Sequence, residues 1–282
     1  MMSWWRLCWA SALRDGRRRW KEPATLAVWF SMPFFIWLLQ EMVFPGLMVS
    51  EVLPEPEANL PGQIISINQT LPSAPRLQVR GLEASWVLFP GSLLLGLLFI
   101  AQNLSDDLWL ELERKTWART RSSPHSRMAL WSAKLVAGSF FLGGVALLAL
   151  AAAFYGYRIP WGRFPVAGLW VVVAGAVFLS LLQCLQLCAS GRRGGSLLTG
   201  ITVLAMAMLG GSFLPFAALP LWWRRIGLWS PSGFVHHGLQ RSLSGDWTAT
   251  SAVGSALVAA ILIAACAWWG NRRMELQLER VS

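Results

Sequence analysis

Charged side chains are scarce in this chain of 282 residues. Asp, Glu, Lys and Arg make up 13% of it, whereas hydrophobic residues make up 55% and the mean hydropathy is +0.48. Soluble domains carry roughly 25% charged residues, so this balance excludes an ordinary soluble protein and predicts a membrane protein with several spans. The net charge of +10 does not indicate nucleic-acid binding, because the basic residues stand mostly in short segments beside apolar runs.

Cysteine, histidine and the common catalytic motifs are also sparse. The four cysteines lie in or beside apolar stretches, so we expect packing thiols and no disulfide framework. The sequence has no GxxxxGK[ST], HExxH or GxSxG motif, which excludes ATP binding by a P-loop and the corresponding hydrolase sites. His236 and His237 are adjacent, so we expect them to point to different faces, as interfacial polar residues rather than as a metal pair.

The apolar residues form six runs, and a helix needs about 20 residues to cross a membrane. We expect spans at residues 23–44, 86–104, 135–154, within 164–191, from 194 onward, and at 247–271. The predicted fold is an all-α membrane protein with six transmembrane helices. Residues 1–22 place their apolar side chains on one face of a helix and most basic ones on the other. This pattern favours an amphipathic interfacial helix over a plain basic anchor.

The predicted spans are almost free of ionisable side chains. Glu41 is the nearest exception, and it lies at the end of the first span. Ion-coupled transporters, proton relays and intramembrane enzymes place carboxylates or histidines at membrane depth. Their scarcity therefore argues against these classes. If the protein moves a cargo, we expect the energy to come from outside the chain.

The distribution of Lys and Arg predicts the orientation of the six spans. With both termini in the cytoplasm, seventeen of these residues lie inside and seven outside. Cytoplasmic loops of membrane proteins carry an excess of Lys and Arg, so this is the favoured orientation. We expect a multi-pass protein of a plasma membrane, such as a bacterial inner membrane, with membrane lipids as its surroundings.

One cytoplasmic segment, residues 105–134, holds ten charged side chains between two uncharged apolar runs. We call it the charged segment. It has to lie in water at a fixed distance from the bilayer, which makes it a natural docking place for a soluble partner.

Two segments on the outer side depart from a plain bundle of six helices. Residues 45–85 contain six prolines and are too short for an independent core, so we expect a small extracytoplasmic element. Residues 215–246 are apolar and aromatic but carry Arg and His, and they start and finish outside. We therefore predict short re-entrant helices in the outer leaflet. The candidate outer gate comprises Pro215, Pro220, Trp222 and Trp223.

The charged segment carries a specific order of residues. Glu113 and Arg114 form a Glu-Arg pair, Ser123-Pro124 follows about ten residues later, and Lys134 stands where the third span begins. This order resembles the cytoplasmic segment between spans two and three of ABC-2 type transporter permeases. The family often has Gly-Thr after the Glu-Arg pair, whereas this chain has Lys115-Thr116, which puts the local turn in doubt.

The stretch after the fifth span is similar to the same family. It reads as a Gly-rich turn at residues 209–212, a proline at 215, a second proline at 220 before aromatic residues, and Ser230-Pro231. Together with the six spans and the N-terminal amphipathic helix, the resemblance covers nearly the whole chain. It implies that residues 23–282 form a transmembrane domain of the ABC-2 type.

The resemblance implies a permease subunit that pairs with a second permease, identical or homologous, and binds two cytoplasmic ABC ATPase subunits. ATP and Mg would bind to the ATPase partners, with no cofactor in this chain. Closure of the ATPases would push on the charged segment, which would act as a cytoplasmic coupling helix, and the motion would pass to spans two and five along the pathway. The implied residues of contact with the ATPase are Glu111, Glu113, Arg114, Arg119 and Arg121.

The cargo and the class of protein leave alternatives open. A hydrophobic or amphiphilic small molecule or lipid is favoured over a polysaccharide or lipid-linked glycan, since glycan permeases of this family tend to have shorter outer loops. A membrane scaffold that recruits a soluble partner through the charged segment is the main alternative to an exporter. A membrane-embedded enzyme is disfavoured, with His236 and His237 as the only opening for it.

Overall fold

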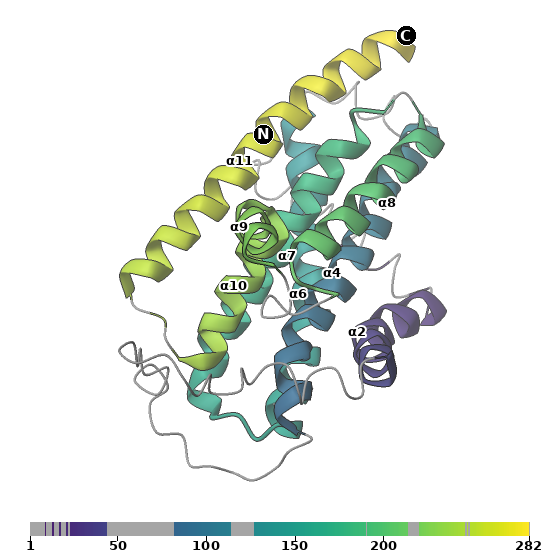
Figure 1. Cartoon of the computed structure of the whole chain (residues 1–282). Coiled ribbons are helices and arrows are strands. Elements are labelled where there is room, and N and C mark those ends of the chain that lie inside the picture. Colours follow the sequence, from purple (N-terminus) through teal and green to yellow (C-terminus); the bar gives the residue numbers. More distant parts are fainter. Residues whose placement is uncertain are drawn as a thin grey trace.

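The computed structural model describes residues 9, 13, 17, 21, 23–43, 82–113, 127–189, 191–213, 220–245, 247 and 249–281 of the chain. Over these residues the protein is helical and contains no strand (Figure 1). The elements are α2 (Pro23–Val43), α4 (Leu82–Glu113), α6 (Arg127–Gly156), η2 (Trp161–Arg163), α7 (Phe164–Gln186), α8 (Arg192–Leu209), α9 (Leu221–Trp229), α10 (Pro231–Ser244) and α11 (Ala249–Val281). The prediction of an all-α protein is confirmed for this part of the chain.

Four of the helices have the length and apolar composition needed to cross a membrane. Their apolar parts are Phe89–Leu110 in α4, Trp131–Gly156 in α6, Trp161–Gln186 in η2 and α7, and Ala252–Gly270 in α11. They coincide with the predicted spans two, three, four and six. The predicted first and fifth spans also form helices, namely α2 with 21 residues and α8 with 18, but neither meets the same criterion within the described residues.

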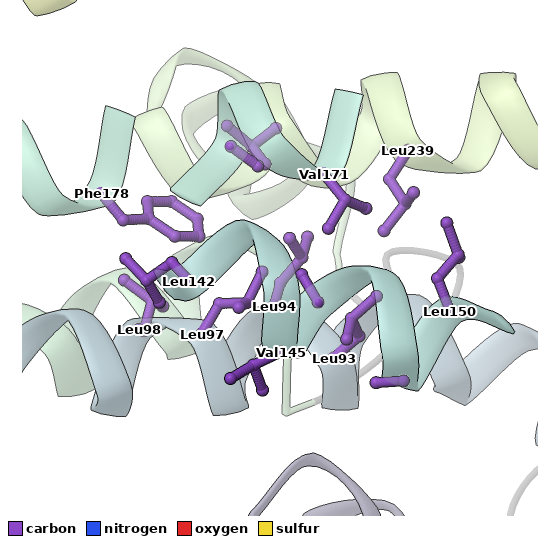
Figure 2. Close-up of a cluster of buried hydrophobic side chains, with 14 of the residues drawn as sticks. Leu93, Leu94, Leu97, Leu98, Leu142, Val145, Leu150, Val171, Phe178 and Leu239 are labelled. Carbon is purple, nitrogen blue, oxygen red and sulfur yellow. The ribbon is translucent and has the colours of Figure 1, made fainter. Parts of the chain in front are cut away.

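The core of the bundle lies between α4, α6 and α7. Leucines 93, 94, 97 and 98 of α4 face Leu142 and Val145 of α6 and Phe178 of α7, and all seven side chains are buried (Figure 2). Helix α7 also contacts α8, α10 and α11, so it is the central element of the described structure. Fourteen of its 23 residues are buried, and they lie on several sides of the helix, as expected for a helix that meets several neighbours.

Glycines allow α6 and α7 to approach closely. A Cβ atom on Gly138 of α6 would lie 2.4 Å from Leu179 Cδ2, and one on Gly168 of α7 would lie 2.8 Å from Leu147 Cδ2. Helices within lipid associate largely through van der Waals packing, because the solvent around them is as apolar as their side chains. Small residues that let a neighbouring leucine reach the backbone therefore supply much of the attraction between these two helices.

Helices α9 and α10 occupy the segment for which short helices were predicted. Ser230 caps α10 by accepting a hydrogen bond from the Gly233 N–H at 3.0 Å, and Pro231 follows at the first helical position. Gly245 ends α10 with a positive φ of 85°, a conformation that glycine adopts readily. In Figure 1, α9 is seen nearly end-on and so lies across the other helices, whereas α10 runs alongside the bundle.

Several predictions fall on parts of the chain that are only partly described. Of residues 1–22, the structure describes Trp9, Leu13 and Arg17 as helical and exposed, and Lys21 in a turn. Most of the outer element, residues 44–81, lies outside the described residues, and residues 82–85 belong to α4. In the charged segment, residues 105–113 continue α4 and residues 127–134 open α6, so the two ends of this segment are extensions of the neighbouring helices.

Candidate coupling and gate regions

Helix α4 joins the core to the first part of the charged segment without interruption. It runs for 32 residues to Glu113, and its only proline, Pro90, lies near its beginning. The backbone of Glu111 and Glu113 is therefore part of the same helix as the buried leucines. Arg114, Arg119 and Arg121 lie outside the described residues. Of the five predicted coupling residues, the structure thus describes only the helical backbone of Glu111 and Glu113.

A polar cluster joins α4, α7 and α8 near this end of the bundle. The Gln186 side chain donates a hydrogen bond from Nε2 to Asp106 Oδ1, and the Ser196 hydroxyl donates to Asp106 Oδ2 at 3.4 Å. Gln186 Nε2 also lies 3.4 Å from Thr199 Oγ1, and Trp109 Nε1 donates to the Gln186 carbonyl at 3.2 Å. We call these five residues the polar junction.

The polar junction supplies a further donor to the end of α7. The last carbonyls of a helix have no partner inside the helix, and the Trp109 indole supplies a donor to one of them at the end of α7. On α8, the Thr199 hydroxyl bonds back to the Gly195 carbonyl at 3.0 Å, which keeps this side chain close to its own backbone. Arg192, the first residue of α8, lies near enough for its charge to act on Asp106.

The position of Asp106 differs from the prediction that the charged segment lies in water from residue 105 onward. Asp106 is half-buried between α7 and α8. The physical reason is that Gln186 and Ser196 supply hydrogen bonds that take the place of water. Sequence reasoning missed the junction because its partners lie 80 and 90 positions away from Asp106 and follow no common pattern.

Gly195 sets the spacing between α7 and α8 at the junction. A Cβ atom at this position would lie 2.1 Å from Gln186 Oε1 and 2.8 Å from Trp109 Nε1. At the adjacent Gly194, by contrast, a Cβ atom would meet only Ala189 Cβ, at an ordinary contact distance of 3.7 Å. The residue at 195 therefore has to lack a side chain for Gln186 to reach Asp106.

The predicted outer-gate residues lie at the beginning of α9, except for Pro215, which lies outside the described residues. Pro220 caps this helix with an extended backbone, φ −54° and ψ 147°. Trp222 is 60% exposed, and its ring meets that of Trp223 edge to face at a centroid distance of 5.2 Å. Trp223 itself is partly buried. This pair forms an aromatic surface on a helix of only nine residues.

Three hydrogen bonds hold α10 against the bundle. The Ser232 hydroxyl donates to the Met206 carbonyl at the end of α8 (2.7 Å), and Trp170 Nε1 of α7 donates to the Val235 carbonyl (2.9 Å). Arg163 Nη1 donates to the Leu243 carbonyl at 2.7 Å, which places the end of α10 beside the beginning of α7. Sequence reasoning had selected none of these three donors, since each is bonded to the backbone of a distant element.

The adjacent histidines point to different faces of α10, as predicted. His237 is exposed, whereas His236 is buried together with Ser232 and Leu239, one turn away on either side. Burial lowers the pKa of His236 to about 4, and the neighbouring His237 adds to the effect, so the imidazole is neutral near pH 7. The expectation of an interfacial side chain is thus wrong for His236. Among the described residues, no group of three His, Cys, Asp or Glu could hold a metal ion.

A bundle with four apolar helices of membrane length defines the class of this chain as a polytopic, all-α membrane protein. The chain belongs to the ABC-2 type transporter family, whose family model matches residues 6–243. A search of curated proteins found no significant match, and neither did a search of solved structures. The match runs from the N-terminal segment to the last turn of α10, so it includes both the predicted coupling segment and the predicted outer gate. The chain is therefore a transmembrane permease of an ABC transporter, a transport subunit that works with ABC ATPase subunits and not itself a catalyst.

Proposed function

We propose that this chain is the permease subunit of an ATP-driven exporter and forms a pathway together with a second permease, identical or homologous. The observation that carries the proposal is the unbroken course of α4 from the buried core to Glu113. A continuous helix transmits a rigid-body displacement, so a push on the charged segment by an ATPase would move the core. ATP and Mg would bind to the ATPase chains.

The proposed arrangement has six spans, with α2 and α8 as the first and the fifth. Pro33 of α2 lies against Gly96 of α4, where a Cβ atom would be only 3.0 Å from the proline ring, which supports α2 as part of the bundle. Helix α8 has polar residues at its start and apolar ones after Thr202. Both termini and the charged segment would face the cytoplasm, with α9 and α10 in the outer leaflet of a bacterial inner membrane.

The proposed cargo is a hydrophobic or amphiphilic small molecule or a lipid. Helix α8, the proposed fifth span, exposes an apolar face made of five large side chains. They are Leu197, Leu198, Ile201, Leu204 and Met208. If this face lines the pathway between two permeases, it offers contacts to acyl chains or aromatic groups and no hydrogen bonds to a sugar. A glycan cargo would favour polar or stacking side chains along this helix.

Charge reversal at the end of α4 tests the proposal. The permease and the ATPase that co-purifies with it from native membranes are reconstituted into vesicles, and ATP-driven movement of a fluorescent phospholipid is followed. We expect Glu113→Arg and Arg114→Glu each to lower movement at least tenfold without changing membrane insertion, because the docking charges lose their complement. Arg158→Glu, an exposed position outside the predicted coupling segment, is the control.

Two results would contradict the proposal. One is a purified permease that retains no ATPase, together with charge-reversed variants that move the lipid as well as the wild type does. The other is movement that is independent of ATP, which would favour a scaffold. Vesicles loaded with a labelled glycan in place of the lipid test the alternative cargo in the same preparation.

A further inference from the structure

We propose that Asp106 is a positioning residue that ties the end of α4 to α7 and α8, so that a displacement of the charged segment reaches α8. This inference rests on the proposed function, because it assumes that an ATPase pushes on the charged segment. It adds a residue that lies among apolar helices rather than on the docking surface. The geometry of the polar junction supports it in three steps.

The first step is the division of the carboxylate between two helices. Oδ1 accepts the hydrogen bond from Gln186 at the end of α7, and Oδ2 accepts that from Ser196 in the first turns of α8. One side chain of α4 is thus bonded to two neighbours at once. A rotation or axial shift of α4 strains both bonds, and the strain is relieved when α7 and α8 move with it.

The second step is the distance from the push. Asp106 precedes Glu113 by seven residues of uninterrupted helix, which corresponds to about 10 Å along the helix axis. Because Asp106 lies this close to Glu113, little of a displacement at Glu113 would be lost through bending of α4. Gln102, one turn before Asp106, lies beside Gly200 of α8, so the contact between these two helices continues past the junction.

The third step is the cost of placing a carboxylate at this depth. An apolar side chain would fit between three helices without any desolvation penalty, whereas a half-buried carboxylate needs donors on both oxygens. Hydrogen bonds to a charged acceptor are stronger and more directional than neutral ones. They therefore define the relative position of the helices more sharply than apolar contact would, and this is the property that a mechanical joint requires.

Coupling and stability can be separated experimentally at this site. In membranes, a single hydrogen bond between helices contributes only modestly to stability, so loss of one bond should leave the fold intact. We therefore compare Asp106→Asn and Ser196→Ala with the control Thr202→Val. The Thr202 hydroxyl donates to the Leu198 carbonyl within α8 and so joins no other helix. The full-length permease and its co-purified ATPase are reconstituted, and the readout is the number of fluorescent phospholipids moved per ATP hydrolysed.

We expect Asp106→Asn and Ser196→Ala to lower the number of lipids moved per ATP by at least about fivefold, the lower end of the usual coupling between distant sites. The rate of ATP hydrolysis and the thermal stability should stay near those of the wild type, as they should for Thr202→Val. Wild-type movement per ATP in both junction variants would overturn the inference while leaving the proposed function in place. Failure of the wild type itself to move lipid with ATP would overturn the proposed function and the inference together.

Discussion

Gly195 is the residue on which the spacing of α7 and α8 depends most directly. Its missing side chain leaves room for the Gln186 amide, which reaches across to Asp106. A larger residue has to displace Gln186 or separate the two helices, and both would break the polar junction. A single missing methyl group thus decides whether three helices share one network of hydrogen bonds.

We expect Gly195→Ala to destabilise the protein by about 1–3 kcal/mol, the usual cost of forcing extra atoms into a close contact. Thermal unfolding of the full-length protein in detergent micelles measures the effect. Gly194→Ala is the matched control, because its Cβ atom would be 3.7 Å from Ala189 Cβ and meets ordinary contact. Equal melting temperatures for the two variants would show that the helices are not as close at Gly195 as the structure indicates.

At the scale of elements, two thiols mark the contact between α7 and α11. The side chains of Cys184 on α7 and Cys266 on α11 lie close enough to interact, and the Cys188 thiol instead donates to the Cys184 carbonyl at 3.3 Å. The sequence had predicted packing thiols without indicating which helices they join. The pair offers a direct test of how the last helix is placed.

Mild oxidation with copper(II) phenanthroline should link Cys184 to Cys266, with two electrons passing to copper and two protons to the medium. Proteolysis between the two positions, followed by electrophoresis without reductant, detects the linked fragments. We expect the link in the wild type and in Cys188→Ser, and none in Cys184→Ser. A link that persists in Cys184→Ser would place Cys266 nearer to Cys188 and shift α11 by about one turn of α7.

The sequence was sufficient to predict most of the elements. Uncharged runs of about 20 residues have few options other than a transmembrane helix, and four such helices coincide with predicted spans. Two prolines and an apolar stretch too short for two crossings were enough to predict the short helices that are observed as α9 and α10. These predictions succeeded because each depends on local composition.

The contacts between elements were not predictable in the same way. Nothing in the chain indicates that Trp170 bonds to the Val235 carbonyl or that Ser232 bonds to the Met206 carbonyl, since each donor meets a backbone acceptor that every residue carries. Likewise, the sequence does not show that Gly195 needs to lack a side chain and that Gly194 does not, because this difference depends on where the Gln186 side chain lies. The roles of all the predicted coupling and gate residues stay predictions, and the coupling arginines and Pro215 also lie outside the described residues.

For the molecule as a whole, the orientation in the membrane is the property that the distribution of charge predicts. Arg158 lies between α6 and α7, and Arg193 lies at the start of α8, so the two belong to opposite ends of α7. Both are exposed. Because Lys and Arg are enriched on the cytoplasmic side, Arg193 should lie inside and Arg158 outside.

In a variant without native cysteines, Arg158→Cys should react with a membrane-impermeant maleimide added to intact cells. Arg193→Cys should react only after permeabilisation. Mass spectrometry of the labelled protein gives the extent of reaction at each position. The reverse pattern would invert the orientation and move the charged segment to the outer side, which no cytoplasmic ATPase could reach.

Few side chains of α11 are buried, and this affects which of its residues can be substituted. Among the side chains of α11 that the structure describes, only Ala259 and Gly270 are buried. The side chains of this helix that would face lipid in a bilayer have to match its thickness. The side chains of α7, by contrast, have to fit against five neighbouring helices. Substitutions that suit a different bilayer should therefore be tolerated more readily in α11 than in α7.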